Sequence, residues 1–151
     1  MTHVELLEDT RQYYENNPRA VRYRSDGLPI CEYKTAEGNK CAVGKELDED
    51  NPNYQKIVTT YNESVCADLF DDYGFTILKE RSQKIEKAFW RMLQLFHDRE
   101  SNWAKTERGH QLTDIGVYEY NALKVWAEEY DETHKKNIAR ANQKLEADHE
   151  S

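Results

Sequence analysis

The sequence predicts a single α+β domain that is mostly helical and has one β-hairpin packed against its helices. Two observations lead to this fold class. Several segments repeat apolar residues at helical spacing, and a loop around residue 38 is flanked by alternating apolar residues. The 151 residues suffice for one domain with a core and are too few for two. We expect this domain to cover residues 1–130, and residues 131–151 to form an exposed helical extension or a disordered tail.

The first helix is predicted to begin directly after Thr2. Thr2 and Glu5 have the spacing of a capping box, in which each side chain accepts a hydrogen bond from an amide of the first turn. Apolar residues such as Leu7 follow at helical spacing. Pro18 disfavours a helical residue before it, so we expect the helix to end near Asn16.

The β-hairpin is expected in the stretch CEYKTAEGNKCAVG, residues 31–44. Strand alternation sends four apolar side chains to one face, namely Cys31, Tyr33, Cys41 and Val43. Gly38 lies in the loop, where a left-handed conformation is needed. A zinc site would need two further ligands, and paired zinc ligands lie closer together than these cysteines. We therefore expect that the protein binds no metal and no cofactor. We also expect its thiols to be reduced, as thiols are in the cytoplasm.

Four later segments complete the predicted fold. Residues 54–61 fit a short helix or an irregular link, and a helix capped by Ser64 should end at Gly74. Residues 74–80 fit a strand or a loop. The strongest apolar stripe predicts a helix from about residue 82 to residue 98, and Thr113 should cap a last helix that passes residue 130. The predicted core consists of Leu7, Cys31, Tyr33, Cys41, Val43, Leu69, Phe70, Phe89, Leu93, Phe96, Ile115, Leu123 and Trp126.

The net charge of −8 is concentrated in one central segment. Residues 45–80 hold nine acidic and three basic side chains, which gives −6. General nucleic-acid binding needs a clustered basic surface, so we do not expect it. The acidic side chains form a candidate partner surface, or else a solvated face without the spacing of a calcium loop: Asp48, Glu49, Asp50, Asp71 and Asp72. No apolar run is long enough to span a bilayer, so no membrane association is expected.

A basic cluster precedes the predicted hairpin. Arg22 and Arg24 flank Tyr23 in a connector rich in turn-forming residues. Guanidinium groups suit phosphate, and a tyrosine ring can stack on a base. These three residues are therefore candidates for binding a ligand or a partner, and a solvated connector is the other interpretation.

A second candidate site lies at the end of the aromatic helix, where His97 and Asp98 are followed by Trp103. A histidine–aspartate pair could act in acid–base chemistry. Adjacent helical residues point about 100° apart, however, so we do not expect Asp98 to orient the ring of His97. A histidine at a helix C-terminus also favours the helix dipole, which is the structural alternative. The sequence contains no nucleophile-elbow, metalloprotease or phosphate-loop motif, and we expect a protein that is not an enzyme.

Four segments of the chain, taken in order, resemble a family of small uncharacterised proteins encoded by tailed bacteriophages and prophages. They are CEYKTAEGNKCAVG, SVCADLFDDYGF, FWRMLQLFHDRESNW and YNALKVWAEEY, and the resemblance covers about residues 1–130. Two ordered patterns support this resemblance. The first is Cys-x-Tyr followed by Gly and then Cys-Ala-Val-Gly, and the second is Leu-Gln-x-x-His-Asp followed by a tryptophan. The resemblance implies phage origin, action in the cytoplasm of the infected bacterium and an accessory role. It assigns no catalytic residue.

These observations lead us to expect a non-enzymatic phage accessory protein that binds and inhibits a host bacterial protein, for example a component of host defence. The alternative is a protein that binds a small ligand or a nucleotide signal, as a sponge. Its ligand would be held by Arg22, Tyr23 and Arg24, with His97 or Trp103. A third interpretation is an enzyme that uses His97 or a cysteine–metal centre.

The last predicted helix also suggests a homodimer. Tyr118, Trp126 and Tyr130 give this helix more aromatic side chains than the surface of a monomer usually needs. A second copy of the chain is therefore a further expected partner.

Overall fold

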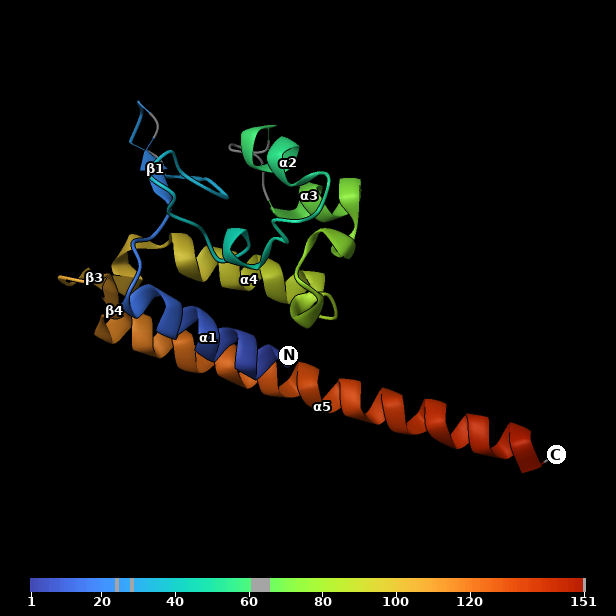
Figure 1. Cartoon of the computed structure of the whole chain (residues 1–151). Coiled ribbons are helices and arrows are strands. Elements are labelled where there is room, and N and C mark those ends of the chain that lie inside the picture. Colours follow the sequence, from blue (N-terminus) through green and yellow to red (C-terminus); the bar gives the residue numbers. More distant parts are fainter. Residues whose placement is uncertain (24, 28, 61–65, 151) are drawn as a thin grey trace.

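The computed structural model describes residues 1–23, 25–27, 29–60 and 66–150. Its helices and strands (Figure 1) are α1 (His3–Glu15), β1 (Val21–Tyr23), β2 (Pro29–Cys31), α2 (Tyr54–Thr60), α3 (Cys66–Tyr73), α4 (Lys87–Asp98), β3 (Trp103–Lys105), β4 (His110–Leu112) and α5 (Asp114–Glu150). Short 3-10 helices connect them: η1 (Gly44–Glu46), η2 (Phe75–Ile77), η3 (Glu80–Ser82) and η4 (Glu100–Asn102). The predicted α+β class, mostly helical with a β-hairpin against the helices, is confirmed.

Helix α1 lies alongside the first half of α5 and runs in the opposite direction (Figure 1). The hydroxyl of Thr2 accepts a hydrogen bond from the Glu5 amide at 3.1 Å, and the Glu5 carboxylate accepts one from the Thr2 amide at 3.0 Å. The predicted first helix and its capping box are therefore confirmed. The face of α1 that packs into the molecule buries His3, Leu6, Leu7, Thr10 and Tyr14.

Helix α4 is the centre of the core and contacts α5 and α3 (Figure 1). Its buried apolar side chains are Phe89, Trp90, Leu93 and Phe96. The predicted start near Ser82 is wrong, because the chain first forms η3 and enters α4 only at Lys87. At this entry the Glu86 amide donates to the Nε2 atom of His3 at 3.0 Å, so a side chain from α1 accepts a hydrogen bond at the start of α4.

Strand pairing differs from the prediction in its position. Within the described residues, β1 pairs with β2 and β3 pairs with β4, both antiparallel. The arms predicted on either side of Gly38 form a single bridge, between Lys34 and Lys40, although Gly38 has the expected positive φ of 89°. The second arm is not a strand: residues 42–43 form a turn that leads into η1, and Gly44 packs directly on the backbone of Tyr33. A Cβ atom at Gly44 would lie 1.9 Å from the Tyr33 carbonyl oxygen.

The helices between this turn and α4 agree with the sequence in part. Residues Tyr54–Thr60 form the expected short helix, and Gly74, with a φ of 73°, ends α3 as predicted. The predicted cap at Ser64 lies outside the described residues. The segment 74–80, for which the sequence allowed a strand or a loop, contains η2 and a bridge between Leu47 and Leu78.

Helix α5 begins as the sequence predicts and continues to Glu150. The Thr113 hydroxyl accepts a hydrogen bond from the Gly116 amide at 3.1 Å, which confirms the predicted cap. The 37 residues of α5 extend over about 55 Å at the usual helical rise. Residues 132–149, which we call the extension, are all exposed. In the described part of the chain, no helix is both long enough and apolar enough to cross a membrane.

Candidate functional site

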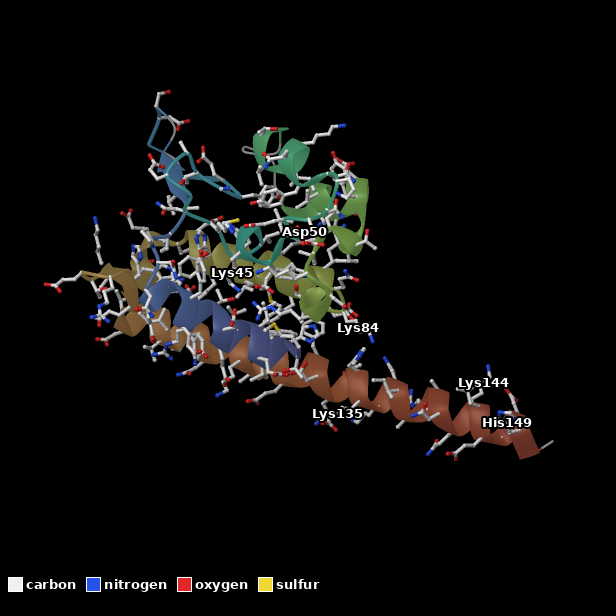
Figure 2. The ribbon with its side chains drawn as sticks, in the orientation of Figure 1. Lys45, Asp50, Lys84, Lys135, Lys144 and His149 are labelled. Carbon is white, nitrogen blue, oxygen red and sulfur yellow. The ribbon has the colours of Figure 1, made fainter. Side chains whose placement is uncertain are left out.

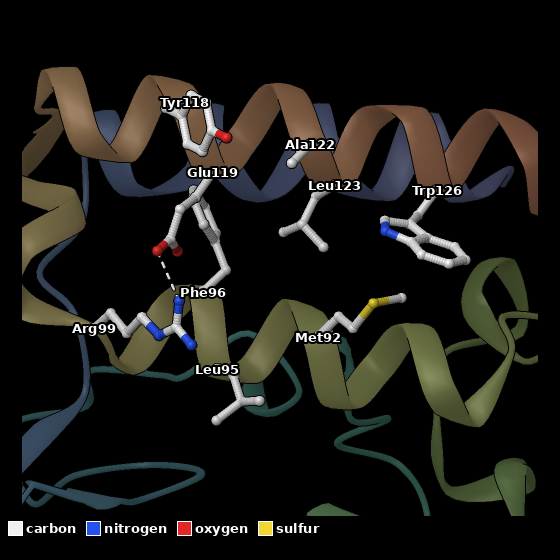
Figure 3. Close-up of a pocket in the computed structure, with 9 residues that line it drawn as sticks. All are labelled: Met92, Leu95, Phe96, Arg99, Tyr118, Glu119, Ala122, Leu123 and Trp126. Atoms are coloured by element: carbon white, nitrogen blue, oxygen red, sulfur yellow. Dashed lines mark hydrogen bonds and ion pairs between the residues drawn. The ribbon is translucent and has the colours of Figure 1, made fainter.

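A groove between α4 and α5 is an exposed apolar feature of the described part of the chain (Figure 3). This α4–α5 groove has a volume of about 240 Å³ and is lined by Met92, Leu95, Phe96, Arg99, Tyr118, Glu119, Ala122, Leu123 and Trp126. Leu95 is 56% exposed, Trp126 52% and Tyr118 77%. Exposed aromatic and aliphatic side chains around a hollow are typical of surfaces that bind other proteins.

One end of the groove is polar. Arg99 donates to the Glu119 carboxylate at 2.6 Å (Figure 3). The second oxygen of this carboxylate accepts from the side-chain amide of Asn102 at 2.9 Å. These contacts join the end of α4 to α5. The groove therefore combines an apolar floor with a fixed pair of charges at one end.

Two residues of the predicted core are exposed, and one of them, Trp126, lines the groove. Ile115 and Trp126 were expected inside, and both are more than half exposed, at 56% and 52%. The buried face of α5 is formed instead by Tyr120, Leu123 and Ala127, which recur at three- and four-residue spacing. Ile115 and Trp126 are off this stripe, so the helix turns them away from its packed face.

His97 and Asp98 contact each other, which the sequence analysis did not expect. The Nδ1 atom of His97 lies 2.8 Å from Asp98 Oδ1, and this oxygen also accepts a hydrogen bond from Gln94 Nε2 at 2.8 Å. The prediction that Asp98 does not orient His97 is wrong, because Asp98 is the last residue of α4 and its carboxylate reaches both side chains. Burial lowers the pKa of His97 below its ordinary value, although Asp98 acts in the opposite direction.

His97 is enclosed in the core, Asp98 keeps 26% of its side chain exposed, and neither residue lines the groove. His97 is fully buried, and Trp103 is 6% exposed. Trp103 packs against Tyr14 at a ring distance of 5.6 Å, and its Nε1 atom donates to the Phe96 carbonyl oxygen at 3.3 Å. Arg19 covers the Trp103 ring at 5.8 Å and donates to the His97 carbonyl oxygen at 2.9 and 2.5 Å. The structure brings His97 and Trp103 together as core residues.

The remaining basic candidates are described only in part. Arg22 and Tyr23 lie in β1, where they pair with Ile30 and Pro29. Their side chains, and Arg24 as a whole, lie outside the described residues.

The acidic candidates lie on two different segments. Glu49 and Asp50 are exposed, and Asp48 is partly exposed and accepts a hydrogen bond from the Asp50 amide at 3.0 Å. Glu49 pairs with Lys40 at 2.8 Å. On α3, Asp71 and Asp72 are exposed, and Asp71 pairs with Lys87 at 2.5 Å. Basic side chains from other segments thus compensate part of this predicted acidic surface.

A buried ion-pair network was missed by the sequence analysis. Glu46 is fully buried and accepts two hydrogen bonds from Arg81, at 2.9 and 2.6 Å. Lys45, also buried, lies 3.3 Å from Glu46 and 3.1 Å from Asp9 of α1. Although burial raises the pKa of Glu46, Arg81 and Lys45 together lower it below its ordinary value. The sequence signal is weak, because Glu46 stands in a run of exposed acidic residues.

The structure describes the side chain of only one of the two cysteines in the predicted hairpin, Cys41. Cys41 is a buried free thiol, and its sulfur accepts a hydrogen bond from the Gly44 amide at 3.3 Å. The side chains of Cys31 and Cys66 lie outside the described residues. Across the described residues, no three His, Cys, Asp or Glu side chains are grouped as metal ligands.

No protein-family model, no curated protein and no solved structure matches this chain.

Proposed function

We propose that this chain is a non-enzymatic protein that binds another protein through the α4–α5 groove and modulates that partner. The observation that carries the proposal is the exposure of Leu95, Tyr118 and Trp126 around one hollow. Apolar surface gains most from being covered, and aromatic side chains contribute strongly to binding at the centres of protein interfaces. The groove is separate from the predicted ligand residues His97 and Trp103, which are buried.

The partner we propose is a protein of a bacterial host, and the modulation is inhibition, for example of a defence component. The support for a host partner is the ordered resemblance of four segments to small bacteriophage and prophage proteins. On this proposal the protein acts in the cytoplasm of the infected bacterium as an accessory factor. Self-association into a homodimer is part of the same proposal, because α5 is long and carries exposed apolar side chains at both ends.

The test is affinity purification of the tagged chain from a bacterial host, with two charge-introducing variants compared by quantitative mass spectrometry. Leu95→Glu places a charge in the groove. Val117→Glu is the matched control, since Val117 is an exposed apolar residue of α5 that does not line the groove. We expect one stoichiometric host protein with the wild-type chain and with Val117→Glu, and its loss with Leu95→Glu.

Binding of the purified host protein to the three chains is then measured by calorimetry. A partner that binds Leu95→Glu as tightly as the wild-type chain would exclude the groove as its site. Recovery of no stoichiometric partner by any of the three chains would overturn the proposal as a whole.

A further inference from the structure

The extension of α5 projects beyond the helix that covers the first part of α5. Helix α1 begins at His3, whose backbone amide and Nδ1 atom each lie 2.8 Å from the Asp131 carboxylate. Farther along, Glu8 pairs with Lys124 and Arg11 lies over the ring of Tyr120, so α1 covers α5 from about residue 120 to residue 131. Residues 132–149 are all exposed, and the side chains of this region point into solvent (Figure 2). In proteins most of the stability of a helix comes from the packing of an apolar face, and the extension has no such packing.

The extension repeats the apolar pattern of the packed face of α5. Tyr120, Leu123 and Ala127 form the buried face of α5, at 6%, 7% and 0% exposure. Eighteen residues later, which is five full helical turns, stand Ile138, Ala141 and Leu145. These three residues therefore lie on the same face of the helix as the covered residues. Ile138 is 49% exposed and Leu145 61%, so the packed face of α5 continues onto the extension without a cover.

We propose that the extension of a second copy of this chain covers this face, antiparallel to the first, with Ile138 of each copy opposite Leu145 of the other. The inference deepens the self-association that is part of the proposed function, and it is independent of the groove. An antiparallel extension runs in the same direction as α1. In this register Glu150 of the second copy lies opposite Thr133, immediately beyond the point where α1 begins. The second copy would thus extend the α1–α5 packing along the uncovered part of α5.

The charges beside the apolar face fit the same arrangement. In helical projection Lys135 and Glu146 lie on one flank of this face. In an antiparallel pair like flanks meet, as in a two-stranded coiled coil. The register above sets Glu146 of the second copy opposite Asn137, about 3 Å along the axis from Lys135. The two-fold symmetry of the pair then forms this Lys135–Glu146 contact twice.

The first test is a charge swap, measured as the dimer dissociation constant by sedimentation equilibrium. Lys135→Glu and Glu146→Lys should each weaken the dimer about 10-fold, because each replaces two attractive contacts by two repulsive ones. The double variant should return to within about 2-fold of the wild-type chain, since both contacts are restored with reversed sign. Circular dichroism of each variant controls for the helix itself. A double variant as weak as the single variants would overturn the register.

The second test is disulfide cross-linking. Ala141 lies beside the two-fold axis of the proposed pair, so Ala141→Cys should form a disulfide-linked dimer, whereas Ile138→Cys alone should not. Oxidation of the wild-type chain, with the linked residues identified by mass spectrometry, controls for the native cysteines. Cross-linking of Ile138→Cys to itself would indicate a parallel pair or a different antiparallel register, and either result would overturn the inference.

A comparison of two surfaces separates this inference from the proposed groove. The double variant Ile138→Glu/Leu145→Glu should be monomeric, and Leu95→Glu should remain dimeric. If Leu95→Glu were monomeric and the double variant dimeric, the two copies would meet at the groove. A monomeric wild-type chain would exclude self-association. Either result overturns this inference, and neither bears on host-protein binding, which has its own test.

Discussion

The Asp131 carboxylate holds His3 at the start of α1. One of its oxygens accepts from the His3 amide and lies 2.8 Å from the imidazole Nδ1 atom, and the other accepts from the Val4 amide at 3.1 Å. The His3 ring stacks on Tyr130 at 5.1 Å, and its Nε2 atom accepts from the Glu86 amide. One side chain of α1 therefore joins the helices α1, α4 and α5.

Removing the Asp131 carboxylate should destabilise the fold. We expect Asp131→Ala to lower the free energy of unfolding by about 2 kcal/mol, because it leaves the first amides of α1 and the buried His3 ring without their acceptor. Urea denaturation measures the loss. Glu132→Ala, at the exposed neighbouring position, should change stability by less than about 0.5 kcal/mol.

The same carboxylate should make the fold sensitive to acid. Although burial raises the pKa of Asp131, the hydrogen bonds from His3 and Val4 outweigh it and lower this pKa below the ordinary value. The stabilisation is therefore complete above the ordinary aspartate pKa and is lost as the pH falls through the folded-state value. Asp131→Asn should flatten the acid limb of the unfolding free energy, and an unchanged acid limb would contradict this role.

Arg81 should be required to keep Glu46 in the core. Arg81→Met leaves a fully buried carboxylate with Lys45 as its remaining charged neighbour, and we expect a loss of about 3 kcal/mol in unfolding free energy. Arg108→Met, at an exposed position, is the matched control and should have little effect. If both variants unfolded at the same urea concentration, the network would not contribute to stability.

His97 should weaken the fold as the pH falls towards the ordinary histidine pKa. Burial lowers the pKa of His97, so the unfolded chain takes up a proton at a higher pH than the folded chain does. Folding stability should therefore decrease between about pH 7 and about pH 5. Burial also lowers the pKa of His110, which adds to the same slope. His97→Gln should reduce the slope, and His134→Gln on the extension should leave it unchanged.

Two tryptophans should differ sharply in their effect on stability. Trp90 is fully buried, whereas Trp126 is 52% exposed at the groove. We expect Trp90→Ala to cost about 4 kcal/mol in unfolding free energy through the cavity it leaves. Trp126→Ala should cost less than about 1 kcal/mol. Comparable losses at the two positions would place Trp126 in the core and remove the main support for the groove.

Local signals in the sequence were sufficient to predict where several helices begin or end. The capping box at Thr2, the cap at Thr113 and the stop at Gly74 each depend on residues within one turn of a helix, and each is present. Burial of Tyr33 and Cys41 was also predicted correctly. The second arm of the hairpin was predicted wrongly, because the alternation of apolar residues does not report the turn and η1, in which Gly44 packs against the Tyr33 backbone.

The candidate site depended even more on tertiary contacts. Helical spacing identified α5 as amphipathic, but it could not decide which apolar residues would face α1 and α4. Trp126 was therefore expected inside, and the groove was missed. Glu46 shows the converse: its position in an acidic run suggested an exposed side chain, and Arg81, thirty-five positions later, together with Lys45 makes its burial tolerable.

The contact between His3 and Asp131 also affects when the fold can form during synthesis of the chain. It joins residues 128 positions apart, so α1 leaves the ribosome long before the helix that covers it has been made. Until then the apolar face of α1 has no partner in α5, and contacts of this sequence separation form slowly. Helix α5 is synthesised after α1 and encloses it, so the domain should become a single cooperative unit only at that step.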